Sequence, residues 1–309
     1  MSKTFFLIGA LFLFAALLFF FKDSQAKNQS LKEVPKDKLQ VSASFYPLYY
    51  LATIIGGDKA TVENLTPAGV EPHEYEPSPQ QLAQIENGNL LILNGGVEAW
   101  GEKMKKNLTG EHVAVVTTGE GLLTKEITEA GEKMQDPHIW LDPEIAKKQV
   151  NKITEAYIKI DPANGVYYQN NEEMLQEKLD ILNTKYQQGL QTCKTRDIIT
   201  SHAAFAYLAQ RYNLHQIAIS GLSTEEEPTA QKLAEVATYA KDNNVKYIFF
   251  ESLVSPKLSE TIAKEIGAKT LVLDPIEGIS DDISKQEKNY FTVMENNLQN
   301  LQTALQCTK

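Results

Sequence analysis

The chain has 309 residues and a formal net charge of −10 at neutral pH. This acidic balance argues against the basic surface that a nucleic-acid partner requires, so no such partner is expected. The length exceeds what one hydrophobic core usually organises, and two domains are therefore expected.

The N-terminus has the features of an export signal. Lys3 supplies a positive start, the run from Phe5 to Phe21 carries no charge, and Ser24-Gln25-Ala26 offers the small residues that an exporting peptidase reads. We predict cleavage near Ala26, which makes residues 1–26 the signal and places the rest of the chain in the periplasm. The apolar run also has the length of the shortest membrane-spanning helices, so an uncleaved membrane anchor is the alternative. No cysteine stands directly after the apolar run, so lipid attachment at a new N-terminal cysteine is not expected.

Residues 27–38 are polar and aperiodic, as expected of a tether, and the folded part is predicted to start near Leu39. Loss of residues 1–26 removes two lysines and one aspartate, which leaves 28 basic and 39 acidic side chains and a formal charge of −11. The acidic character therefore belongs to the exported part.

From Leu39 onward, short apolar runs alternate with amphipathic stretches. Four predicted strands in each half, with helices between them, are typical of α/β lobes with parallel sheets. We therefore predict two Rossmann-like lobes, residues 39–160 and 193–309, each with a four-stranded, mainly parallel sheet. The predicted strands are Leu39–Phe45, Thr61–Leu65, Leu90–Asn94, Val113–Thr117, Asp197–Thr200, Gln216–Ser220, Lys246–Glu251 and Lys269–Leu273.

One long linking helix is predicted between the lobes, in residues 161–192. After Asp161-Pro162 a long stretch lacks proline, and its apolar residues recur at helical intervals. These residues are Leu175, Leu179, Leu182, Tyr186 and Leu190. Such a helix would be a stiff connection rather than a flexible hinge. An ordinary surface helix of one larger domain is the alternative.

Several helices have recognisable boundaries. Pairs of a capping residue and a proline predict helix starts, because the side chain satisfies free N–H groups and proline suits the first turn. Gly267 is a plausible helix end. The predicted starts are Ser78-Pro79, Asp142-Pro143, Asp161-Pro162 and Ser255-Pro256.

Four side chains lie where predicted strands stop or loops begin: His73, His138, His202 and Asp274. Ligands of open α/β folds gather beyond the carboxyl ends of the strands, so these residues are expected to meet in the cleft between the lobes. Three imidazoles and one carboxylate form a nitrogen-rich shell that suits Zn²⁺ better than Mg²⁺, Ca²⁺ or Mn²⁺. A single histidine is more often a surface or core residue than a metal ligand. The metal site is favoured because these four residues share the same position relative to the predicted strands.

The other two histidines are interpreted as surface residues. His112 precedes a predicted strand, which is the wrong end for such a site, and His215 lies next to the start of another. The two cysteines, Cys193 and Cys307, are the whole cysteine content. In an oxidising compartment an even pair is expected to be bridged, with two buried free thiols as the alternative.

Five stretches, in order along the chain, resemble those of the zinc-type metal receptors of bacterial ABC transporters, the cluster A-I (cluster 9) solute-binding proteins. The resemblance covers the chain from Leu39 to the C-terminus. It implies two lobes joined by one helix, a metal between them, and delivery to a membrane permease driven by a cytoplasmic ATPase, with the receptor as a monomer. The stretches are residues 66–79, 136–143, 201–208, 219–228 and 271–278.

The resemblance also implies a ligand set and a metal. The family's histidine ligands fall on His73, His138 and His202, and its carboxylate position on Asp274, where water is the alternative ligand. Manganese-type relatives carry a carboxylate at the position of His202, so zinc is predicted and a manganese receptor is the alternative. Many zinc-type members have a histidine-rich loop before the second ligand, but residues 119–135 contain no histidine here.

Two other classes compete with a transport receptor. A hydrolytic zinc enzyme would use three histidines, an open fourth position, and Glu71, Glu74 or Glu277 as general base. No His-Glu-x-x-His motif is present and Asp274 would fill the fourth position, so no enzyme is expected. An adhesin is the other alternative, although the sequence shows no additional adhesive module.

Overall fold

The structure is a computed structural model that describes residues 38–129, 132–222, 228–253, 255–278 and 288–308. The predicted signal, residues 1–26, and nearly all of the tether lie outside these residues. Among the residues described, no helix is both long enough and apolar enough to span a bilayer.

The first sheet is parallel and has the strand order β2-β1-β3-β4. β3 is buried along its whole length, as expected of a central strand covered on both faces. Its strands are β1 (Leu39–Ala43), β2 (Ala60–Asn64), β3 (Leu90–Leu93) and β4 (Ala114–Thr117), and the helices between and after them are α2 (Tyr46–Gly56), α3 (Pro79–Glu86) and α4 (Gly101–Asn107).

The second sheet is also parallel, with the order β10-β9-β7-β8. The predicted fold class, two lobes each with a four-stranded parallel sheet, is therefore confirmed. The strands are β7 (Asp197–Thr200), β8 (His215–Ala218), β9 (Tyr247–Phe250) and β10 (Lys269–Val272), and the helices are α7 (Ala206–Arg211), α8 (Ala230–Asp242), α9 (Lys257–Ile266) and α10 (Tyr290–Ala304).

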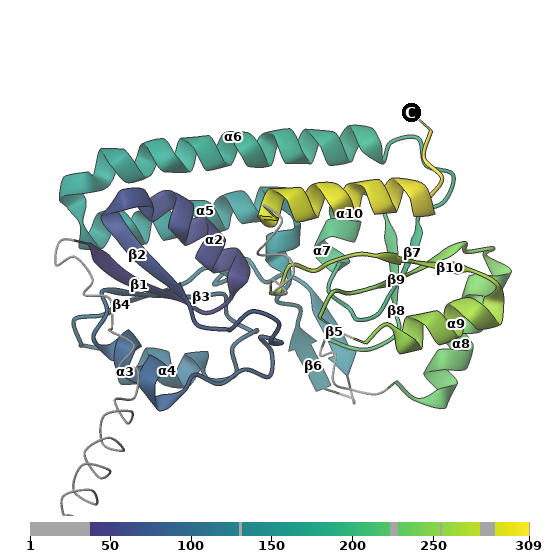
Figure 1. The fold of residues 1–309 in the computed structure, drawn as a ribbon, viewed down its shortest axis with the longest axis horizontal. Coiled ribbons are helices and arrows are strands. Elements are labelled where there is room, and N and C mark those ends of the chain that lie inside the picture. The colour runs from purple at the N-terminus through teal and green to yellow at the C-terminus, as the bar shows by residue number, and fades with distance from the viewer. Residues whose placement is uncertain (1–37, 130–131, 223–227, 254, 279–287, 309) are drawn as a thin grey trace, which may run out of the picture. The chain divides into compact units, whose positions relative to one another are not determined.

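The predicted linking helix is α6 (Gly165–Gly189), which follows α5 (Pro143–Ile160). One face of α6 is buried, including Leu175, Leu179, Leu182 and Tyr186, as the helical spacing predicts. α6 packs on α2 and α5 beside the first sheet and on α10 beside the second, so it runs along both lobes (Figure 1). The apolar core is continuous from one lobe to the other. The exact domain boundaries remain a prediction.

Most predicted helix boundaries are present. Ser78 forms a capping box with Gln81, Asp142 caps α5 through the N–H of Glu144, and Gly267 ends α9 in the left-handed conformation. Two starts differ. Asp161-Pro162 opens a short 3₁₀ turn (Pro162–Asn164) before α6, and α9 begins after Pro256 without a side-chain cap.

The histidine-free stretch 119–135 contains an antiparallel hairpin that was not predicted, β5 (Glu126–Glu129) with β6 (Glu132–Gln135). The strands are short and polar, so the alternation that reveals a half-buried strand is absent. Tyr207 of the second lobe fixes the base of the hairpin. Its hydroxyl accepts from the backbone N–H of Thr124 at 2.9 Å and donates to the carbonyl of Asp136 at 3.1 Å. The hairpin therefore leads into the loop of His138 from an anchored base.

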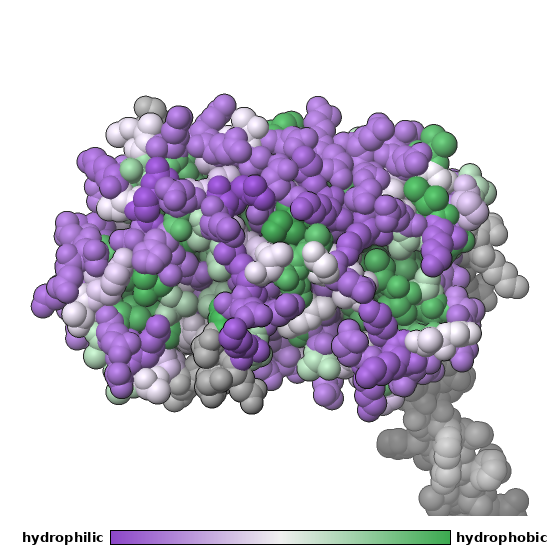
Figure 2. Space-filling view, turned by 180° about the vertical axis from the view of Figure 1, so that it is seen from behind, coloured by the Kyte–Doolittle hydropathy of each residue, from purple (hydrophilic) through white to green (hydrophobic). Residues whose placement is uncertain are grey.

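The predicted disulfide between Cys193 and Cys307 is present. It joins the segment after α6 to the end of the chain after α10, so it fastens the C-terminal helix to the second lobe. The face seen in Figure 2 is mostly hydrophilic, with small, separate apolar areas, in keeping with the acidic composition.

Candidate metal centre

The three predicted histidines come from three different loops. His73 lies between β2 and α3, and His138 lies between β6 and the short 3₁₀ turn Ile139–Leu141. Both belong to the first lobe. His202 follows β7 of the second lobe directly. Because parallel strands of a lobe end at the same edge of their sheet, the loops that follow them are brought together there.

The imidazole Nε2 atoms converge. Nε2 of His138 lies 3.3 Å from Nε2 of His73 and 3.4 Å from Nε2 of His202. The carboxylate of Glu277, in the loop after β10, faces all three of these nitrogens. Its Oε1 is 2.9 Å from Nε2 of His138, 3.5 Å from that of His73 and 3.4 Å from that of His202. One oxygen and three nitrogens therefore face one point.

Two of the histidines have a carboxylate behind the ring. Nδ1 of His138 is 2.8 Å from Oδ1 of Asp136, and both side chains are fully buried. Nδ1 of His202 forms an ion pair with Oε1 of Glu251 at 2.6 Å, and both side chains are buried. Carboxylates placed in this way fix the ring orientation and leave Nε2 directed at the metal.

The charges of the metal-free cluster are coupled. Burial lowers the pKa of the His138 imidazole, but Asp136 and Glu277 outweigh this effect and raise it. Burial acts in the same way on His202, whose pKa is nevertheless raised well above the usual value by Glu251 and Glu277. Burial would raise the pKa of Glu277, yet the neighbouring imidazoles hold it well below its usual range. Protons on the histidines thus balance Glu277, and a cation at the same point would replace them.

The structure does not bring Asp274 into this group. The described residues contain two sets of side chains able to hold a metal, His73 with His138 and Glu277, and His202 with Glu251 and Glu277. The carboxylate oxygens of Asp274 are used elsewhere: Oδ1 accepts from the backbone N–H of Ile276 at 2.7 Å, and Oδ2 from the hydroxyl of Ser252 at 2.5 Å. Asp274 lies in the same loop, three residues before Glu277.

Sequence reasoning named Glu277 only as the general base of an alternative enzyme. Asp274 stands directly at the end of the predicted strand, which is the position expected of a ligand in an open α/β fold. A carboxylate a few residues into the loop can reach further into the cleft than one at the end of the strand. The pattern Asp-Pro-Ile-Glu has a carboxylate at each of these two positions, Asp274 and Glu277. Which of the two faces the histidines depends on the path of the loop, which the sequence pattern does not define.

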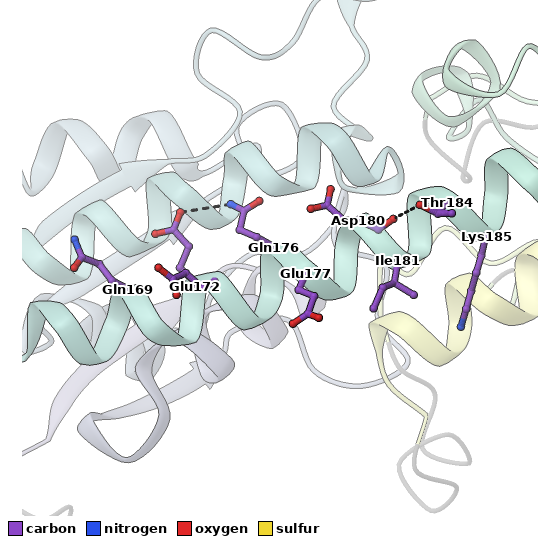
Figure 3. Close-up of a pocket in the computed structure, with 9 residues that line it drawn as sticks. Gln169, Glu172, Gln176, Glu177, Asp180, Ile181, Thr184 and Lys185 are labelled. Atoms are coloured by element: carbon purple, nitrogen blue, oxygen red, sulfur yellow. Dashed lines mark hydrogen bonds between the residues drawn. The ribbon is translucent and has the colours of Figure 1, made fainter.

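The two histidines interpreted as surface residues, His112 and His215, are exposed. A hollow of about 980 Å³ lies along α6, and Figure 3 shows that mostly polar and charged side chains of this one helix line it. It contains no histidine and is separate from the cluster. The candidate metal centre is instead a group of side chains that are buried apart from His73, whose side chain is 10% exposed.

Hydrogen bonds across the lobes hold the ligand loops at a fixed separation. The indole Nε1 of Trp140, two residues after His138, donates to the carbonyl of Pro275 at 2.7 Å, two residues before Glu277. The hydroxyl of Tyr290 donates to the carbonyl of Trp140 at 2.5 Å. The geometry is thus suited to binding one divalent cation with three nitrogens and one oxygen, a donor set that favours Zn²⁺ among physiological metals.

Comparison with known proteins agrees with this geometry. Residues 41–304 match the family model described as zinc-uptake complex component A, periplasmic. The chain is 36% identical to the high-affinity zinc uptake system protein ZnuA of Bacillus subtilis, over 97% of this chain and 96% of that protein.

Two solved structures extend the comparison. The Zn(II)-bound ZnuA-like domain of Streptococcus pneumoniae AdcA has a TM-score of 0.77 and 40% identity, covering 87% of this chain and 99% of that domain. The laminin-binding protein of Streptococcus agalactiae, described as bifunctional with adhesin and metal-transporting activity, has a TM-score of 0.79 and 30% identity, over 87% of this chain and 99% of that one. With its family model matched over both lobes, this chain belongs to the ZnuA family, the periplasmic component A of zinc-uptake complexes.

Proposed function

We propose that this protein is the extracytoplasmic receptor of a zinc import system. It captures one Zn²⁺ between its lobes and delivers the ion to a membrane permease that a cytoplasmic ATPase drives. One observation carries the proposal: Oε1 of Glu277 lies within 3.5 Å of the Nε2 atoms of all three histidines. The names of the family and of the relatives, which refer to zinc uptake, support zinc over manganese as the cargo.

We propose His73, His138, His202 and Glu277 as the zinc ligands. Glu277 replaces Asp274 in this set, because the oxygens of Asp274 are engaged by Ser252 and by the backbone of Ile276. The distances between donor atoms in the metal-free cluster are compatible with tetrahedral coordination at about 2.0–2.2 Å from each donor, after small movements of the side chains.

The proposal makes a catalytic role unnecessary. A hydrolytic zinc site keeps one coordination position for water. In the proposed site Glu277 occupies that position, and both imidazoles that have a carboxylate behind them are fully buried. This arrangement favours retention of the ion over turnover of a substrate.

The test is zinc titration of the full-length exported protein isolated from the cell, in competition with a chelator of known affinity, followed by competition with Mn²⁺. One equivalent of Zn²⁺ bound in preference to Mn²⁺ is expected. Glu277→Gln should weaken zinc binding strongly, whereas His215→Ala, at an exposed histidine, should leave it unchanged. Failure of the wild-type protein to bind zinc, or equal loss in both variants, would refute the proposal.

A further inference from the structure

The turn that carries Glu277 into the site has an unusual backbone. Ile276, directly before Glu277, has a φ of +62°, in the left-handed region. The other non-glycine residues with positive φ in the described part of the chain are Asn213, Asn244 and Gln306, so Ile276 is the one β-branched residue among them. This conformation is strongly disfavoured for a β-branched residue and persists only where surrounding contacts impose it.

The carboxylate of Asp274 supplies two of these contacts. Oδ1 accepts from the N–H of Ile276 at 2.7 Å, which closes the turn over the strained residue. Oδ2 accepts from the hydroxyl of Ser252, in the loop after β9, at 2.5 Å. Both oxygens of Asp274 are therefore occupied within the second lobe, and the side chain is 7% exposed.

The backbone of Asp274 is held as firmly as its side chain. Asn297 of α10 accepts from the N–H of Asp274 at 2.9 Å and donates to its carbonyl at 2.6 Å. The next carbonyl, of Pro275, accepts from the indole of Trp140 in the first lobe. Polar contacts at three successive residues thus fix the direction in which Glu277 leaves the turn.

We propose that Asp274 is a positioning residue, which imposes the left-handed turn at Ile276 and thereby aims the Glu277 carboxylate at the three histidines. The inference rests on the proposed zinc site and gives the acidic residue after β10 a different role from that of a ligand. A ligand must contribute a negative oxygen to the metal. A positioning residue needs only an acceptor for the N–H of Ile276 and a partner for Ser252.

The amide variant separates these roles. Asp274→Asn keeps Oδ1 as an acceptor, and its amide can donate to the Ser252 hydroxyl, which is able to accept. Asp274→Ala removes both contacts. We expect Asp274→Asn to bind zinc within about threefold of wild type, and Asp274→Ala to lose about 10- to 100-fold, the usual effect of removing an outer-shell partner. The matched control is Asp242→Asn, at an exposed aspartate that ends α8.

A spectroscopic readout accompanies the titration. Co²⁺ bound in place of Zn²⁺ reports ligand type and geometry through its visible absorption bands. The Co²⁺ spectrum of Asp274→Asn should match that of wild type, and the spectrum of Asp274→Ala should change, because Glu277 no longer occupies its position. Circular dichroism of the metal-free variants establishes that each is folded, and Asp274→Asn decides the matter if Asp274→Ala does not fold.

Two results would overturn the inference. Loss of affinity in Asp274→Asn as large as in Glu277→Gln, with an altered Co²⁺ spectrum, would make Asp274 a ligand. Unchanged zinc affinity in a folded Asp274→Ala would show that the turn does not depend on Asp274. Either result leaves the proposed zinc function standing as long as the wild-type protein binds zinc, and absence of binding by the wild type would refute both proposals.

Discussion

The two lobes present their ligands in different ways. In the second lobe, His202 and Glu277 follow β7 and β10 closely, and Glu251, which supports His202, follows β9. In the first lobe, His73 lies in the loop between β2 and α3, and His138 follows a hairpin that is separate from the main sheet. A ligand just after a central strand, as His202 is after β7, inherits the rigidity of the sheet, whereas β10 is an edge strand and Glu277 depends on the turn that precedes it. A ligand in a loop needs other contacts, which Asp136 and Tyr207 supply for His138.

His73 is the least enclosed of the three histidines. Its side chain is 10% exposed, against 0% for His138 and His202. The backbone N–H of His73 donates to the carboxylate of Glu71 at 3.3 Å. Burial and the charge of Glu277 raise the pKa of Glu71 to about 7. The first lobe therefore offers a ligand at the margin of the site, whereas the second lobe supplies only buried ones.

The largest effect is expected when the disulfide is removed. Only the second lobe carries this bridge. Replacement of Cys193 and Cys307 by serine opens a loop with a sequence separation of 114 residues. The chain-entropy relation gives about 4–5 kcal/mol for such a loop, and measured values are often smaller. We expect urea unfolding of the metal-free double variant to show a loss of this order.

The same double variant tests whether the bridge supports the metal site. Cys307 follows α10 and its N–H donates to the carbonyl of Gln302 in that helix, which also supplies Asn297 to the Glu277 turn. Zinc affinity should fall modestly together with stability. Unfolding curves of the variant that overlay those of the wild type, measured without reductant, would contradict the prediction.

The second prediction compares one ligand from each lobe. Zinc binding in structural sites is worth roughly 10 kcal/mol or more, so one of four ligands accounts for about 2.5 kcal/mol, or roughly 70-fold in affinity. We expect His202→Ala to lose at least this much, because the ligand is fully buried and its supporting carboxylate, Glu251, loses the imidazole partner. His73→Ala should lose less, because water can reach its position. Chelator competition measures both, and a greater loss in His73→Ala would reverse the comparison of the lobes.

The third prediction concerns selectivity. His202→Glu replaces a nitrogen donor of the second lobe with a harder oxygen, which should shift the ratio of Zn²⁺ to Mn²⁺ affinity toward Mn²⁺ by about tenfold or more. His73→Glu makes the same chemical change in the first lobe and serves as the matched variant. A ratio that stays constant in His202→Glu would show that this position does not govern the choice of metal.

The fourth prediction concerns the pH dependence of binding. The raised pKa values of His138 and His202 mean that both imidazoles are protonated in the metal-free protein to a higher pH than free histidine. Zinc must displace these protons, so its apparent affinity should fall as the pH is lowered, by about tenfold per pH unit for each proton released. Calorimetry in buffers of different ionisation enthalpy counts the protons.

Removal of the supporting carboxylates should shift this profile. Glu251→Gln lowers the pKa of His202 and Asp136→Asn that of His138, so in both variants the loss of zinc binding should begin at a lower pH than in wild type. We expect the larger shift for Glu251→Gln, because the pKa of His202 is the one raised well above its usual value. A profile that is identical in all three proteins would show that the carboxylates do not control the competing protons.

The sequence by itself determined the strands of the two main sheets, the linking helix and three of the four proposed ligands. Strand positions followed from runs of apolar residues such as Leu90–Leu93, and the buried face of α6 followed from its helical spacing, because both are local patterns. The histidines were identifiable because each stands after a predicted strand or in a loop beyond one. The pairing of Cys193 with Cys307 followed from their being the only two cysteines of a chain that is predicted to be exported.

Tertiary structure decided what depends on contacts between distant segments. The hairpin β5–β6 has little pattern of its own and is anchored by Tyr207, more than seventy residues later in the chain. The direction of Glu277 depends on the left-handed turn at Ile276, and the two residues before Ile276 are held by Asn297 of α10 and by Trp140 of the other lobe. Residue type and spacing cannot distinguish Asp274 from Glu277, since only the folded path of the turn determines which carboxylate faces the histidines.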